Sequence, residues 1–431
     1  MRRWMRWLAA GALTGALAVS QSGCFAVARH AYKAMEGGHR HHHREEQATA
    51  RSAAPTPVIL ISIDGFRADY LNRGVTPNLK ALADGGARAE RMAPSFPSLT
   101  FPNHYTLVTG LVPDHHGIVN NTFEDPTLPD GKFRIASKAA VTDRKSWDGG
   151  TPIWVTAERA GIRTGTEFWP GSEADIQGVR PSLYTPFDQK VTSDDRVDKL
   201  LSWLDLSAAQ RPAFMTLYFD IVDTAGHYHG PDSPEVNAAA ATVDAAIGRL
   251  EAGLKARGVT ANLIIVADHG MAPTPPDQHL FMDTWADPAS FRVVTSEAVA
   301  GLVPLTPEAE TRLLVHHDHA ACYRKAQIPA HFHYGTNPRI PPIVCVADTG
   351  WLMTTHALEA RYSHPLLGEH GYDPVDPLMG ALFIANGPKF LPGVVLKPFP
   401  NTDVYPLLAR LLDLMPEPND GHIQDLYPAL R

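Results

Sequence analysis

Acidic and histidine residues that could hold metal ions recur along the chain directly after apolar runs. Carboxylate oxygens and imidazole nitrogens are the donors that Zn²⁺ accepts, with Mn²⁺ and Co²⁺ as competitors. The stretches that contain them are VILISID, DTAGHYHG, ADHG and GEHGYD. Their candidate ligands are Asp64, Asp223, His227, Asp268, His269 and His370. A set of this size exceeds one tetrahedral site, so it predicts two metal ions.

A threonine that could act as a nucleophile lies in PSFPSLTFPNHYTLVTG, residues 94–110. Thr100 has two interpretations on its own. It could cap a following helix, because threonine often accepts a hydrogen bond from the first turn. It could also attack an electrophile, but an alcohol is a poor nucleophile until a metal or a base activates it. The stretch alone does not decide between them.

Alternating apolar and amphipathic segments predict the elements that would position these residues. Runs at 58–64, 213–220, 261–270 and 381–387 are typical of buried strands, and 77–85, 234–258 and 402–414 are typical of helices. This alternation predicts an α/β fold with a mostly parallel sheet and helices on both faces. Ligands of such sheets bind beyond the carboxyl ends of the strands, where Asp64, Asp268 and His269 would lie.

Each stretch alone has an ordinary structural explanation. A single aspartate after a strand is more often a helix cap or turn residue than a metal ligand. Their joint occurrence at successive strand ends favours a metal site. The histidines of HHDH (316–319) and HFH (331–333) lack that placement, and we interpret them as surface residues. Asp220 is interpreted as a neighbour of the ligands.

Between about 272 and 368 the elements become shorter and are separated by proline-rich loops. We interpret this stretch as an inserted α+β subdomain, with decoration of the main sheet as the alternative. It contains Cys322 and Cys345, which could form a disulfide in an oxidising compartment or remain two buried thiols.

The N-terminus has the composition of an export signal. MRRWMRW is basic, and LAAGALTGALAVS is a short apolar segment that ends before Cys24. Residues 1–23 are predicted to be a signal peptide. We favour a lipoprotein-type signal that leads to lipidation of Cys24, although Gln21 stands where leucine is usual. The alternative is cleavage after A-V-A (26–28), which would release a soluble protein. Residues 37–57 are polar and rich in small side chains, and residues 24–57 are expected to form a flexible tether. We expect a periplasmic protein, anchored to the outer membrane if Cys24 is lipidated.

The formal net charge of −8 gives no indication of a nucleic-acid groove. An anionic substrate would therefore need local positive charge, which bound metal ions supply. We expect a monomer that acts on a small molecule.

The quoted segments resemble one known family. ISIDGFRADY, LTFPNHYTLVTGLVPDHHGIVNN, DTAGHYHGP, ADHGM, RIPPIVCVADTGW and EHGYD are similar to the nucleotide pyrophosphatase/phosphodiesterase family of the alkaline phosphatase superfamily. The resemblance runs from about Val58 to the C-terminus, so a single alkaline-phosphatase-like domain is expected over 58–431. One departure is Ile221-Val222 before Asp223, where many relatives have Glu-Pro.

The resemblance implies a role for each residue. Thr100 would be the nucleophile and would also touch a zinc ion held by Asp64, Asp268 and His269. A second zinc ion would be held by Asp223, His227 and His370. Asn121 would donate to a phosphate oxygen. The aromatic clamp for a nucleotide base would consist of Phe101, Tyr184 and Tyr218.

Three rival functions share much of this sequence evidence. A phosphate monoesterase of the same superfamily would use the same metals but usually adds Arg or Lys near the nucleophile, and none is close to Thr100 in sequence. A choline-headgroup phosphodiesterase could use the aromatic residues as a cation cage. A non-catalytic zinc-binding protein would not require the threonine. We favour hydrolysis of nucleotide phosphodiesters to nucleoside 5′-monophosphates through a phosphothreonine intermediate.

Overall fold

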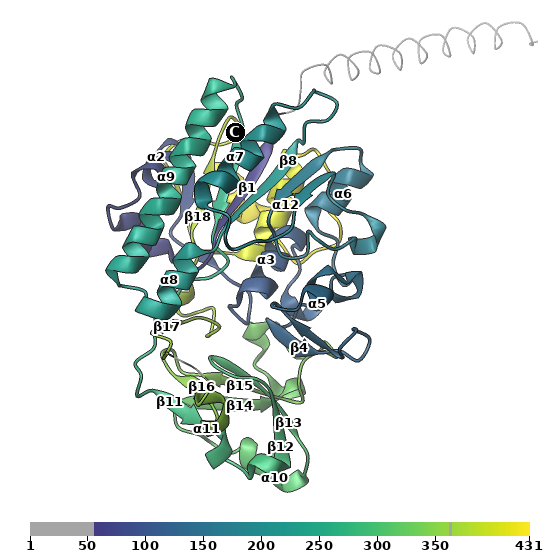
Figure 1. Cartoon of the computed structure of the whole chain (residues 1–431), viewed down its shortest axis with the longest axis vertical. Helices are drawn as coiled ribbons and strands as arrows, with labels where there is room; N and C mark the ends of the chain where they lie inside the picture. Colours follow the sequence, from purple (N-terminus) through teal and green to yellow (C-terminus); the bar gives the residue numbers. More distant parts are fainter. Residues whose placement is uncertain (1–55, 362–363) are drawn as a thin grey trace, which may run out of the picture. The chain divides into compact units, whose positions relative to one another are not determined.

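The computed structural model describes residues 56–361 and 364–431, and the predicted signal peptide and nearly all of the predicted tether lie outside them. The described residues form one compact unit, Thr56–Arg431. Its centre is an eight-stranded sheet (Figure 1) in the order β19-β2-β18-β9-β1-β8-β6-β7.

The middle of this sheet consists of the apolar runs predicted to be strands. β1 (Val58–Ile63) lies between β8 (Phe214–Phe219) and β9 (Asn262–Val266) and is parallel to both. Every residue of these three strands is buried. Burial on both faces is what continuous apolar runs in a parallel sheet require. The fold class, an α/β protein with a mostly parallel sheet, is therefore confirmed.

The outer strands are less regular. β6 (Thr164–Glu167) and β7 (Leu183–Thr185) extend the sheet in parallel beyond β8. On the other side β18 (Phe383–Asn386) runs antiparallel to β9 and β2 (Ala87–Ala89). β19 (Val394–Leu396) completes that edge and is parallel to β2. Short strands such as β2 carry too little sequence pattern to be predicted.

Helices fall into two groups around the sheet. α2 (Pro77–Gly85) and α7 (Ser193–Leu204) both contact the long α9 (Pro234–Ala256), while α12 (Val404–Leu411) contacts α3 (Thr100–Thr109) and α6 (Ile153–Arg159). The predicted start of α2 is confirmed, because Thr76 is its N-cap and Pro77 its first residue.

A second sheet lies within the segment predicted to be an inserted subdomain (green in Figure 1). It has four strands: β12 (Phe291–Thr295), β13 (Val299–Pro304), β15 (Ile343–Ala347) and β14 (Ala320–Arg324). Its strands are antiparallel and pack a separate hydrophobic core. Cys322 and Cys345 face each other on β14 and β15 and form a disulfide, as the first of the two alternatives predicted.

Candidate active site

The predicted metal ligands come together at the carboxyl ends of the central strands. Asp64 directly follows β1, and Asp268 and His269 follow β9 by two and three residues. Asp223 and His227 lie on α8 (Ile221–His229), which begins one residue after β8. His370 follows the short strand β17 (Gly368–Glu369). The parallel strands β1, β8 and β9 therefore gather five of these residues, and β17, which pairs antiparallel with β10 (Ala272–Pro273), brings His370 to Asp223.

Thr100 is the first residue of α3, and the N-cap of that helix is Leu99. The alternative interpretation of Thr100 as the cap is therefore wrong. Its Oγ1 lies 3.3 Å from His269 Nε2. The helix start places this half-buried hydroxyl against the cluster, while α3 itself is anchored by a run of buried residues from Pro102 to Thr109.

The three histidines of the cluster share one hydrogen-bonding arrangement. Each Nδ1 lies 2.9 Å from a backbone carbonyl oxygen: that of Gly368 for His227, of Gly270 for His269 and of Ser98 for His370. Because a carbonyl only accepts, each Nδ1 carries the proton. The lone pair of each Nε2 is then available to a metal. Metal-binding histidines usually donate their other ring N–H to a carbonyl or carboxylate in this way.

The separations between donor atoms fit bound metal better than direct hydrogen bonds. His269 Nε2 lies 3.4 Å from Asp64 Oδ1, His227 Nε2 lies 3.4 Å from Asp223 Oδ2, and His370 Nε2 lies 3.5 Å from Asp223 Oδ1. Ligands about 2.1 Å from a tetrahedral ion lie about 3.4 Å apart. The pair His269 Nε2–Asp268 Oδ2 is closer, at 2.9 Å.

Buried carboxylate oxygens without hydrogen bonds support the same conclusion. Within the described residues, Asp64 Oδ1, Asp223 Oδ1 and Asp268 Oδ2 have no hydrogen-bond partner. A buried charged oxygen left unpaired is costly, so a cation is expected between them. The donor set therefore fits a metal centre of the kind that zinc prefers.

The pKa values of the cluster are shifted by burial and by neighbouring charges. Burial, followed by the charges of Asp268 and Asp223, raises the pKa of Asp64 well above its usual value. Burial also opposes a charge on Asp223, yet His227 and the other imidazoles lower the pKa of this carboxyl to about 2. Burial and the neighbouring His269 lower the pKa of His370 to about 3, which keeps its imidazole neutral.

Asn121 and Phe101 lie beside the nucleophile. The Phe101 N–H donates to Asn121 Oδ1 over 2.9 Å. This bond fixes the orientation of the amide, because its oxygen is occupied and its NH₂ group remains to donate. Asn121 lines a hollow together with Asp223, His227 and His370, which we call the metal-side hollow.

A second cavity, of about 310 Å³, is lined by Phe101, the residue after Thr100, and is called here the aromatic cavity. Its walls include Phe101 and Tyr218, two of the three residues predicted to be the clamp. Tyr218 also donates its hydroxyl to Asp64 Oδ2 over 2.6 Å, so it helps to orient a predicted ligand.

The remaining clamp residue lies elsewhere. Tyr184 is on β7, where the guanidinium of Arg180 lies 5.7 Å from its ring centre, and it does not line the cavity. The ring of Phe187 lines the cavity instead and lies 5.9 Å from that of Tyr218.

Several residues at the site were missed by sequence reasoning. Lys138 lines the aromatic cavity and pairs with Glu173 over 2.8 Å, which supplies a cation that is remote from Thr100 in sequence. His104 lies one helical turn after Thr100, and its Nδ1 contacts the Thr100 carbonyl oxygen at 2.9 Å. The sequence could have indicated His104 as a site residue, because it lies in FPNH four residues after Thr100, one helical turn away.

Glu369 is the other buried group that the sequence analysis did not select. Burial raises the pKa of Glu369 to about 8 despite the neighbouring His227. Its Oε1 accepts the His370 backbone N–H.

The fold and the site define an α/β protein with a histidine–carboxylate metal centre and a threonine hydroxyl at the carboxyl edge of its main sheet. A profile of the type I phosphodiesterase/nucleotide pyrophosphatase family matches residues 58–373. The chain belongs to this family of enzymes, as the resemblance of its motifs implied.

Curated relatives agree with this assignment. An uncharacterised pyrophosphatase/phosphodiesterase of Schizosaccharomyces pombe is 41% identical over 393 residues, which are 87% of this chain and 80% of the relative. Bovine ectonucleotide pyrophosphatase/phosphodiesterase family member 3 is 38% identical over 381 residues. That match covers 85% of this chain but spans only 43% of the bovine protein.

Solved structures of the family have the same fold. Human ectonucleotide pyrophosphatase/phosphodiesterase 5 superposes with a TM-score of 0.82 at 34% identity, covering 87% of this chain and 99% of the human one. The murine protein, in an inactive threonine-to-alanine variant in complex with AMP, gives the same TM-score.

Proposed function

We propose that the protein is a two-zinc hydrolase that releases nucleoside 5′-monophosphates from phosphodiesters and pyrophosphates. The observation that carries this proposal is the Thr100 hydroxyl, which lies 3.3 Å from His269 Nε2 of the histidine–carboxylate cluster and directly precedes Phe101, a residue of the aromatic cavity. A hydroxyl in this position can be activated as a nucleophile by a neighbouring metal or base.

The proposed zinc ligands form two sets. Asp64, Asp268 and His269 would hold one ion near Thr100, and Asp223, His227 and His370 would hold the other. His104 is not assigned as a ligand, because Ser62 Oγ lies 2.8 Å from its Nε2 and the Thr100 carbonyl occupies its Nδ1. When bound, zinc favours the ionised form of hydroxyl groups and neutralises charge that develops on phosphoryl oxygens.

The chain's own residues carry out the displacement. Thr100 Oγ1 loses its proton to water and forms a bond to phosphorus, while the bond from phosphorus to the leaving oxygen breaks and that oxygen takes a proton from water; the product is a phosphothreonine that still carries the nucleoside. Asn121 donates from its NH₂ group to a non-bridging oxygen, since its own oxygen is held by the Phe101 N–H. Attack by water on phosphorus then releases the nucleotide and restores Thr100.

The aromatic cavity is proposed to hold the nucleoside. The AMP complex of the murine relative supports a nucleotide as the substrate of the family. Phe101 and Tyr218 offer rings for stacking, worth about 1–3 kcal/mol per base. Phe187 is the third ring that we assign to this cavity, and Tyr184, 41% exposed, stays an outer contact in this proposal.

The test compares two nitrophenyl substrates of the zinc-loaded protein: the ester of thymidine 5′-monophosphate and nitrophenyl phosphate. We expect kcat/KM to be at least about a hundredfold higher for the diester, because Asn121 is a neutral donor that suits a monoanionic group. A preference for the monoester would identify a phosphatase and would assign Lys138, which lines the cavity, to the phosphate. Turnover of neither would leave a zinc-binding protein without this activity.

We further propose that the protein is exported and acts as a monomer. The predicted signal peptide and the Cys322–Cys345 disulfide support an oxidising compartment. Over residues 56–361 and 364–431, no helix has the length and apolar character that a membrane span requires. Fractionation of cells that carry Cys24→Ala tests lipidation, since loss of a lipid anchor moves the protein from the membrane to the soluble fraction.

A further inference from the structure

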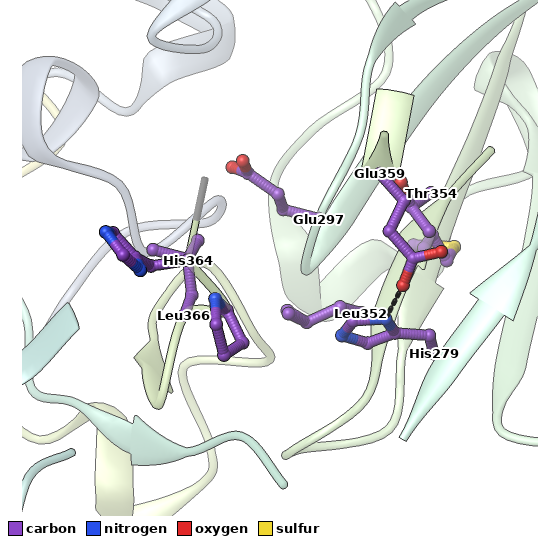
Figure 2. A pocket seen from close by; sticks show the side chains of 9 residues that line it. His279, Glu297, Leu352, Thr354, Glu359, His364 and Leu366 are labelled. Atoms are coloured by element: carbon purple, nitrogen blue, oxygen red, sulfur yellow. Dashed lines mark hydrogen bonds and ion pairs between the residues drawn. The ribbon is translucent and has the colours of Figure 1, made fainter. Parts of the chain in front are cut away.

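A cavity within the 272–368 segment lies next to the metal-side hollow and is called here the acidic cavity. It has a volume of about 240 Å³. Its polar walls come from several elements (Figure 2): His279 of β11 (His279–Phe281), Thr354 of β16 (Leu352–Thr354), Glu359 of α11 (His356–Glu359), and Glu297 and His364 from loops. In Figure 2 the hydrogen-bonded His279 and Glu359 face His364 and Leu366 across it.

The acidic cavity shares two wall residues with the metal-side hollow. Glu297 and Leu366 line both this cavity and the metal-side hollow, which contains Asp223, His227 and His370. The aromatic cavity is a different space that is lined by Phe101 and Tyr218. The described cavities thus provide two separate places for the two halves of a diester.

The direction of attack decides which half enters which cavity. In an in-line displacement the attacking and leaving oxygens lie on opposite sides of phosphorus. Thr100 Oγ1 lies 3.3 Å from His269 Nε2, on the side of the ligand set that includes Asp64 and Asp268. The leaving oxygen therefore points over Asp223, His227 and His370, toward the metal-side hollow and the acidic cavity beyond it.

The charges that line the metal-side hollow and the acidic cavity favour an uncharged leaving group over an anionic one. Glu297 and Glu359 are acidic, and none of the described residues that line the acidic cavity or the metal-side hollow is a lysine or an arginine. The Glu359 carboxylate is paired with His279 Nδ1 over 2.7 Å. Carboxylates that accept hydrogen bonds suit hydroxyl donors and repel a pyrophosphate anion.

The backbone at Glu297 is a second, independent observation. Its φ is +79°, in the left-handed region that glycine normally occupies. Glu297 is held there by two backbone hydrogen bonds with Met353. A side chain kept in this conformation between two hollows of an active site is often functional, because the strain must be offset by the surrounding structure.

We propose that the acidic cavity is the leaving-group subsite of this enzyme and selects diesters that release an uncharged, hydroxyl-bearing alcohol, such as a second nucleoside, over nucleoside triphosphates. This inference rests on the proposed function. As the bond from Thr100 Oγ1 to phosphorus forms, the threonine proton passes to water, and the electron pair of the breaking bond goes to the leaving oxygen, which takes a proton from water and departs as the alcohol.

The experiment uses two substrates that release the same nucleotide. Uridylyl-(3′→5′)-adenosine and ATP both give 5′-AMP, but the first releases uridine and the second pyrophosphate. The measured quantity is the ratio of kcat/KM for ATP to kcat/KM for the dinucleoside monophosphate. Differences in the intrinsic reactivity of the two leaving groups cancel when this ratio is compared between variant and wild type.

Glu297→Gly removes the carboxylate and places the residue type that the left-handed backbone favours. We expect the ratio to rise by about fivefold or more, because repulsion of pyrophosphate and contact with the alcohol are both lost. The matched control is Asp413→Gly, which makes the same change at another acidic residue with positive φ, +56°, outside both cavities. Its ratio is expected to match that of wild type.

Glu359→Gln is the second variant and remains informative if Glu297→Gly does not fold. Its amide oxygen can still accept from His279, so mainly the negative charge is lost. A rise of the ratio in the same direction supports the subsite. Ratios within about twofold of wild type in both folded variants, or an equal rise in Asp413→Gly, would overturn it. If wild type hydrolyses the nitrophenyl diester while these ratios stay constant, only the subsite is refuted; if it hydrolyses no diester, the proposed function fails.

Discussion

The side-chain amide of Asn121 offers a sharp test of the proposed phosphate site. Its Oδ1 accepts the Phe101 N–H over 2.9 Å, so only the NH₂ group is left to face the metal-side hollow. Asn121→Ala removes the donor and leaves the Phe101 N–H without its partner. Asn121→Asp preserves an acceptor for that N–H but places a carboxylate where phosphate oxygens would bind.

The expected losses follow from this geometry. Removing one preorganised donor to a developing oxyanion typically costs about 10²–10³ in kcat, or about 2.7–4 kcal/mol. We therefore expect kcat/KM of Asn121→Ala on the nitrophenyl thymidine diester to fall by about a hundredfold or more. The kcat/KM of Asn121→Asp should be roughly another tenfold lower, because the new carboxylate and a phosphate oxygen near 4 Å repel each other even at an effective dielectric constant of about 20.

The assay is steady-state kinetics with zinc content and a melting temperature measured on the same samples. The neighbouring Asn120→Ala is the matched control, since Asn120 Oδ1 accepts the Thr122 N–H and makes no contact with the start of α3 among the described hydrogen bonds. Its kcat/KM should stay within about tenfold of wild type. The reasoning fails if folded, zinc-loaded Asn121→Ala keeps more than about a tenth of the activity, or if Asn121→Asp is the more active variant.

Three further changes test the nucleophile and two buried carboxyl groups. Thr100→Ala should lower turnover of the diester by about 10³-fold or more while zinc content, measured by atomic emission, is retained; substantial turnover in the zinc-loaded variant would exclude Thr100 as the nucleophile. Asp114 accepts backbone N–H groups from Gly335, Thr336 and Asn337, so Asp114→Ala should lower the free energy of unfolding in a urea titration by about 3 kcal/mol. Burial opposes the charge on Asp114, but these bonds lower its pKa, so the difference should be full above the unfolded pKa and disappear as the pH falls through the lowered folded value. Burial raises the pKa of Glu167 to about 7, so its contribution to stability is present below the unfolded value and is lost as the pH rises through 7. Relative to Glu167→Gln, wild type should therefore lose about 3 kcal/mol between pH 4.5 and pH 8, and parallel stability curves would contradict this.

The sequence determined which residues can meet at the site. Continuous apolar runs at 58–63, 214–219 and 262–266 form the three central strands, and the polar residues that follow them lie at one edge because parallel strands end there together. This local pattern places Asp64, Asp268 and His269 without knowledge of the complete fold. The antiparallel strand β18 and the short β2 were beyond such reasoning, since their direction and pairing depend on neighbours far away in the sequence.

Only the tertiary structure decided how these side chains are oriented and which of their nitrogen atoms carry protons. The proton of His370 is fixed by the carbonyl of Ser98 and that of His227 by Gly368, partners 272 and 141 positions away. The presence of Phe187 in the wall of the aromatic cavity and of Glu297 in the walls of two hollows also depends on the tertiary structure. Residue types and spacing determine the available donors, acceptors and strand ends. Loop packing over long sequence separations sets their orientation, because hydrogen bonds and cavities depend on atomic positions that no local pattern encodes.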